Sequence, residues 1–137
     1  MSDISMILKR IGATLVTDVA PKLEGDYSSG HANMSGLLAS MAGDMFDKEA
    51  DLLVNEIAGL RALLEAGGVA HGVPDATSFK VSDLKATRNA LADELIKLQS
   101  ELESRSDDAS KALNTNIWGH LLATCAARMP APPQFGG

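Results

Sequence analysis

The sequence of 137 residues has one cysteine and few aromatic side chains. A single thiol, Cys125, cannot form an internal disulfide bond, and its isolation fits a reducing compartment. Its sequence neighbours, Thr124 and Ala126, offer no base that would activate the thiol. We therefore interpret Cys125 as a small packed side chain and not as a nucleophile.

A long hydrophobic run is also missing. The longest apolar segment, residues 117–129, includes a glycine, a histidine, a threonine and an arginine, and it is too short to span a bilayer. Residues 1–16 have no uninterrupted apolar stretch after a basic start, which is unlike a secretory signal peptide. The sequence therefore predicts a cytoplasmic protein without a membrane segment.

Positive charge is scarce and scattered along the chain. Twelve Lys and Arg residues stand against 18 Asp and Glu residues, which gives a net charge of −6 at pH 7. Nucleic acids and anionic membranes are bound by clustered cations, whereas Lys9–Arg10 is the only adjacent pair here. We predict neither a nucleic-acid nor a membrane partner, and we attribute the acidity to a solvated exterior.

Sequence signatures of known chemistry are absent as well. The chain has no Gly-rich phosphate-binding loop and no Gly-x-Ser-x-Gly nucleophile motif. His31, His71 and His120 lie far apart, and none has the Glu-x-x-His spacing of metal sites in helical bundles. We predict no metal, no cofactor and no catalytic residue, and we leave open a metal site that is assembled only in three dimensions.

The sequence does contain helical periodicity along most of its length. Four helical segments are predicted: Asp3 to Ala20 or slightly beyond, His31 to Ala66, Ser82 to the reversal at 104–108, and Asp107 to Arg128. No alternation of β-branched and aromatic residues indicates a strand. The predicted fold is all-α, a mostly antiparallel four-helix bundle formed by residues 1–129 as a single domain, with a flexible Pro/Gly-rich tail at 130–137.

The second predicted helix is unusually long. Its 36 residues would extend ~54 Å, whereas a compact chain of this size is only ~37 Å across. The apolar stripe ends at Gly67–Gly68, a helix-stop signal. An interior glycine such as Gly43 costs ~1 kcal/mol relative to alanine, so we expect the helix to continue through Gly43, straight or bent.

The far end of this long helix carries more apolar surface than its predicted neighbours cover. The first helix is only ~30 Å long, and we expect the third helix to pair antiparallel with the end of the second. Residues 67–81 include four apolar side chains, so this loop should lie against the surface. Either the loop covers the exposed end or another chain does, and we predict a homo-oligomer. The predicted interface residues are Ile57, Leu60, Leu64, Leu84, Trp118 and Leu122.

Two stretches without charge, residues 27–43 and 112–127, are expected to pack together. Within the second stretch, polar side chains recur every four residues and could line a ligand pocket, because histidine titrates near neutral pH. The same polar row could instead be a seam that sets helix register. The predicted ligand-binding residues are Met41, Met45, Asn116, His120 and Thr124.

Two functions therefore follow from the sequence. The first is a non-enzymatic helical interaction protein or accessory subunit, which acts by self-association or by binding a protein partner. The alternative is a small-molecule-binding helical bundle, which includes the case of a weakly specified enzyme, with its pocket near Asn116, His120 and Thr124.

Overall fold

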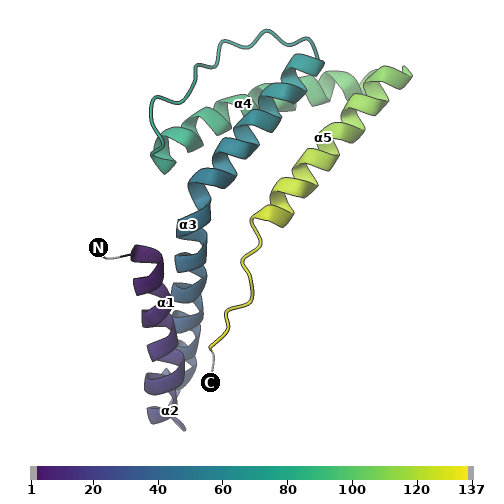
Figure 1. Ribbon diagram of the computed structural model, residues 1–137. Helices are drawn as coiled ribbons and strands as arrows, with labels where there is room; N and C mark the ends of the chain where they lie inside the picture. The colour runs from purple at the N-terminus through teal and green to yellow at the C-terminus, as the bar shows by residue number, and fades with distance from the viewer. Residues whose placement is uncertain (1–2, 136–137) are drawn as a thin grey trace. The chain divides into compact units, whose positions relative to one another are not determined.

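The computed structural model describes residues 3–135, which are helical over most of their length (Figure 1). The elements are α1 (Ile4–Thr14), the π-helical turn η1 (Leu15–Val19), α2 (Ala20–Lys22), α3 (Ser28–Ala66), α4 (Val81–Glu103) and α5 (Asp108–Ala127). No strand occurs among the described residues. The predicted fold class is confirmed: four helical segments, of which α1, η1 and α2 form the first and α3, with 39 residues, is unusually long.

Side chains and glycines set the helix ends. Asp3 accepts a hydrogen bond from the Met6 N–H (3.2 Å), and Asp107 accepts one from the Ser110 N–H (2.9 Å). The Ser110 N–H lowers the pKa of Asp107, because it favours the charged carboxylate. Helix α3 stops where predicted, since Gly68 takes φ +67° and its N–H bonds the Glu65 carbonyl (2.9 Å).

Pro21 is accommodated by a local widening of the first helical segment. Proline lacks the N–H that would bond the carbonyl of residue 17, and its ring crowds that carbonyl. The sequence predicts a kink or an end at this position. In the structure the chain forms the wider turn η1 just before Pro21 and then ends the segment at Lys22.

Contacts divide the chain into two compact units, which we describe separately. The first unit contains residues 1–48 and 129–137, and the second contains residues 49–128. Residues 129–135, which include most of the predicted tail, belong to the first unit; Gly136 and Gly137 lie outside the described residues.

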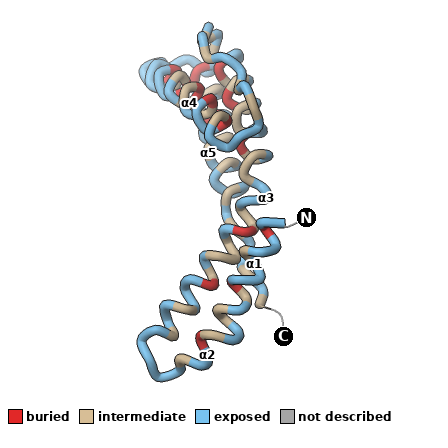
Figure 2. The backbone as a smooth tube through the Cα atoms, turned by 90° about the vertical axis from the view of Figure 1, so that its left-hand side faces the viewer, coloured by how far each residue is buried: buried red, intermediate tan, exposed pale blue. Residues whose placement is uncertain are grey.

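The first unit is an antiparallel hairpin of α1 and the beginning of α3, joined through small residues. Gly12 lies beside Gly36, and Ser5 lies beside Gly43. A Cβ atom on Gly12 would lie 2.5 Å from the Gly36 carbonyl oxygen, so the two backbones touch. Figure 2 shows burial at only a few positions along this hairpin. The buried residues are Ser5, Gly12, Ala20, Gly36 and Gly43.

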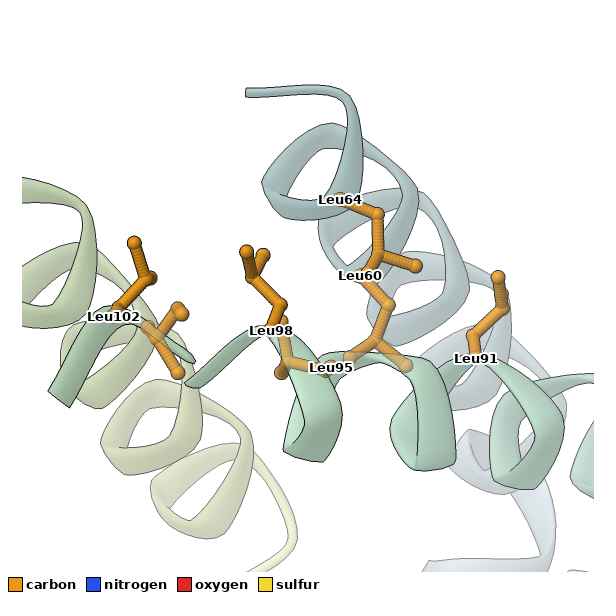
Figure 3. Packing of buried hydrophobic residues seen from close by; sticks show 7 residues of the cluster. Leu60, Leu64, Leu91, Leu95, Leu98 and Leu102 are labelled. Atoms are coloured by element: carbon orange, nitrogen blue, oxygen red, sulfur yellow. The ribbon is translucent and has the colours of Figure 1, made fainter. Parts of the chain in front are cut away.

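The second unit has a leucine-rich core. It is formed by the end of α3, by α4 and by α5, and Figure 3 shows its leucines pointing toward one another. The predicted apolar row of α4 supplies most of it, which agrees with helical periodicity. The buried cluster consists of Leu60, Leu64, Leu91, Leu95, Leu98, Leu102 and Ile117.

The pairing of α3 with α4 differs from the expected antiparallel one. Salt bridges join Glu49 to Lys85 (3.2 Å) and Glu56 to Arg88 (3.5 Å), so residue numbers rise together along both helices. Residues 67–80 make this arrangement possible, because they form a long connection that packs beside α3 instead of a tight reversal. Helix α5, by contrast, runs antiparallel to both α3 and α4.

Candidate functional site

Glu56 of α3 is the centre of an ion-pair cluster in the second unit. Its carboxylate lies 3.5 Å from the Arg88 Nη1 of α4 and 2.6 Å from the Arg128 Nη2 at the end of α5. The Glu56 side chain is only 12% exposed, and the two arginine side chains are 24% and 28% exposed. One partly desolvated carboxylate therefore joins three helices.

His120 of α5 packs against α3 at Gly59. A Cβ atom on Gly59 would lie 2.5 Å from the His120 Cε1 and 2.7 Å from its Nδ1, so the imidazole occupies the space that a side chain would fill. The Nε2 atom of His120 is buried and has no hydrogen-bond partner. Such an atom costs free energy unless it is bonded.

A groove of about 220 Å³ brings the ion-pair cluster and His120 together. Its polar lining includes Asn55, Glu56, His120, Thr124 and Arg128. The Thr124 hydroxyl donates to the Leu121 carbonyl (2.9 Å), and its oxygen can still accept a hydrogen bond. We call this space the histidine groove.

The predicted ligand-binding residues do not all line this groove. His120 and Thr124 line it, whereas Asn116 is exposed and lines a separate groove with Leu102 and Arg105. Each four-residue step turns ~40° around a helix, so three such residues spread over two sides. Met41 and Met45 belong to the first unit. A ligand-binding role for these residues stays a prediction.

Three polar residues of the groove were not predicted from the sequence, namely Asn55, Glu56 and Arg128, and Glu56 is the central one. It is separated from Arg88 and Arg128 by 32 and 72 residues, so no local spacing connects them. One local signal exists: Glu56 has Leu52 and Leu60 one turn away on either side. A lone acid within an apolar stripe indicates a partner on another helix.

The predicted interface residues fall into two groups. Leu60, Leu64 and Leu84 are buried in the second unit, and Ile57 packs against its core. Val69 and Val73 of the 67–80 connection also pack against this core, so this connection covers the apolar end of α3, which is one of the two alternatives predicted for it. The remaining two side chains, Trp118 and Leu122, are 53% and 69% exposed.

The first unit leaves many of its larger apolar side chains at the surface. Ile4, Ile7 and Ile11 of α1 are 39 to 51% exposed, although they recur at helical spacing. We call these three residues the isoleucine ridge. Other exposed apolar side chains of this unit include Met6, Tyr27, Met34, Leu38 and Phe46.

Residues 3–135 contain no group of three or more His, Cys, Asp or Glu side chains placed to hold a metal ion. None of the helices in that range is both long enough and apolar enough to cross a membrane. Comparison of the chain with models of protein families, with curated proteins and with solved structures finds no match.

Proposed function

We propose that this chain is a non-enzymatic helical interaction protein of the cytoplasm that associates with a second copy of itself through the isoleucine ridge. The observation that carries the proposal is the incomplete burial of the first unit. Its fully buried residues are all small, Leu8, Leu15 and Val16 are only partly buried against α3, and the isoleucine ridge lies outside. A two-helix unit of this kind buries too little apolar surface by itself.

Packing one ridge on another would form a four-helix arrangement from two hairpins. Such contact removes apolar area from water on both copies, which is the usual driving force of association. A symmetric pair is the expected form, because two-fold dimers are the commonest homo-oligomers. An accessory role beside another protein would use the same exposed side chains.

Sedimentation equilibrium over about 1 to 200 µM should give a mass above that of one chain. Ile7→Lys should raise the dissociation constant at least about tenfold, because it places a charge in the apolar contact. Met6→Lys is the matched control: Met6 is the adjacent residue, is exposed to a similar degree (45% against 39%), and lies on another side with Lys9 and Asp47. A monomer at the highest concentration would refute self-association.

The histidine groove supports a second candidate function, the binding of a small polar molecule. The supporting observation is the buried and unpartnered Nε2 of His120 beside a charged cluster. A ligand that bonds this atom should raise the melting temperature in a thermal-shift screen of small carboxylates and alcohols. His120→Ala should abolish that rise while Asn116→Ala, which alters the separate groove, should retain it. An equal response in both variants would exclude this site.

A further inference from the structure

Helix α5 of the second unit has an exposed side without charge. Ten of the 16 residues in 112–127 are exposed, and none of them is Asp, Glu, Lys or Arg. The exposed side of α4 in the same unit carries charge at regular intervals, at Lys85, Asp93, Lys97 and Glu101. A solvated helix usually has charged or polar residues opposite its core. The exposed side of α5 therefore has the composition of a contact surface.

Large and small residues are combined on this exposed side. Trp118 is 53% exposed and Leu122 is 69% exposed, and tryptophan is the residue type that most often anchors an interface. A Cβ atom on Gly119 would have no atom within 4 Å. The packing of the chain itself thus requires no glycine there, although glycine inside a helix costs ~1 kcal/mol relative to alanine. We call this surface the neutral side; it consists of Thr115, Trp118, Gly119, Leu122, Ala123 and Ala126.

We propose that the neutral side of α5 binds the neutral side of a second copy, with the two α5 helices antiparallel. In a two-fold contact each surface meets an identical surface, so a surface with a net charge would repel its copy. The chain has a net charge of −6, and two copies therefore approach most favourably where neither carries charge. This contact belongs to the second unit and does not depend on the isoleucine ridge of the first.

The order of large and small residues along α5 matches an antiparallel pair. When the two helices are centred between residues 120 and 121, Leu122 lies level with Gly119 of the partner subunit. Trp118 then lies level with Ala123 of the partner subunit, so each large side chain meets a small residue. A shift by one residue would place Trp118 level with Leu122 of the partner subunit. Gly119 is explained by this pairing, because it leaves room for the leucine of the other copy.

Sedimentation equilibrium of full-length variants tests this contact separately from the ridge. In Ile7→Lys, which weakens the ridge contact, association through α5 should persist within about 1 to 200 µM. Adding Leu122→Lys should raise the remaining dissociation constant at least about tenfold, because it places two charges in the apolar contact. Ile96→Lys is the matched control, since Ile96 lies on α4 and is 62% exposed. A monomeric Ile7→Lys variant, or equal effects of the two added lysines, would refute the α5 contact and leave the ridge standing.

Gly119→Leu tests the close approach of the two helices. The open space around this position lets one chain accept the larger side chain, and leucine favours the helix more than glycine does. In the Ile7→Lys background the dissociation constant should rise at least about tenfold, because the added side chain fills the space for Leu122 of the partner subunit. Gly30→Leu, at an equally open position of α3, should leave the dissociation constant unchanged. Equally tight association of Gly119→Leu would overturn the pairing over Gly119.

Distances between spin labels in the same background measure the direction of the pair. One label is attached to the exposed Cys125, and another, in a chain with Cys125→Ser, is attached at Lys111→Cys. The antiparallel pair predicts Cα separations between copies of ~16 Å at residue 125 and ~30 Å at residue 111. A parallel pair would give about 10 Å at both positions. Two equal short distances would refute the antiparallel arrangement.

Discussion

Replacing Gly12 and Gly36 together by alanine is expected to separate α1 from α3 in the first unit. A Cβ atom on Gly12 would lie 2.5 Å from the Gly36 carbonyl oxygen, and one on Gly36 would lie 2.7 Å from the Gly12 carbonyl oxygen. Both obstacles are backbone atoms, which cannot rotate aside as a side chain does. The helices must therefore move apart, and we expect a loss of about 2 to 4 kcal/mol of hairpin stability.

The direction of the change in hairpin stability shows whether the two backbones are in contact. Alanine is the better helix former by ~1 kcal/mol per residue, so without the close contact the double variant would be more stable than the wild type. Gly30→Ala is the matched control, because Gly30 lies in the same helix with no atom within 4 Å of the added Cβ. That variant should keep or gain stability.

Hydrogen exchange of the α1 amides measures the outcome. Protection should fall across residues 4–14 in the double variant and should stay unchanged in Gly30→Ala. The second unit serves as an internal reference, since its core contains neither glycine. Unaltered protection of α1 in the double variant would show that the hairpin does not depend on backbone contact.

The helices themselves could be predicted from the sequence because their signals are local. The leucine row of α4 repeats at helical spacing, and it is buried from Leu84 to Leu102. The end of α3 at Gly67–Gly68 was predicted for the same reason, since a left-handed glycine ends helices. These features depend on residues within one or two turns.

The pairing of the helices could not be predicted in the same way. On α1, periodicity predicts an apolar side that contains Leu8 and Leu15 as well as the isoleucine ridge. Helix α3 contacts this side only at its edge, at Leu8 and Leu15, and packs mainly on Ser5 and Gly12, so the ridge stays outside. Backbone contact between small residues outweighs burial of the isoleucines within one chain. Periodicity shows which side of a helix is apolar, and it does not show which side its neighbour selects.

The course of residues 67–80 was likewise beyond local reasoning. The valines of this connection indicate that it packs against the protein. They do not indicate the helix along which it runs or the direction in which it runs. The direction follows from Arg61, whose guanidinium donates to the Val73 and Pro74 carbonyls (3.5 and 3.2 Å) and pairs with Asp75 (3.0 Å). These contacts hold the connection beside α3 and lead to the unexpected pairing of α3 with α4. The same connection covers the apolar end of α3 with Val69 and Val73, which is one of the two alternatives predicted for that end.

Glu56→Ala is expected to lower the stability of the second unit by about 2 to 3 kcal/mol. Removing the shared carboxylate leaves Arg88 and Arg128 facing each other in a partly desolvated site, and an unpaired charge costs more than a lost pair. We expect a smaller loss of stability than at a fully buried site, because about a quarter of each arginine side chain is exposed to water. Urea unfolding followed by Trp118 fluorescence reports this unit, since Trp118 is the only tryptophan.

Glu94→Ala supplies the comparison. Its carboxylate also makes a 2.6 Å bond, to Lys97 of the same helix, yet this pair is 29% and 69% exposed. An exposed pair of this kind contributes at most about 0.5 kcal/mol. If Glu56→Ala lowered the free energy of unfolding no more than Glu94→Ala does, burial would not make the ion pairs of Glu56 more stabilising than an exposed pair.

A second substitution separates unpaired charge from lost packing. Adding Arg128→Met to Glu56→Ala removes one of the two facing cations while keeping an unbranched apolar chain in its place. Stability should recover by about 1 kcal/mol or more if repulsion between the arginines causes the loss. A further decrease would mean that Arg128 stabilises the unit mainly through its methylene groups. In that case the histidine groove would owe its shape to packing, and Glu56 would serve chiefly to orient the two arginines.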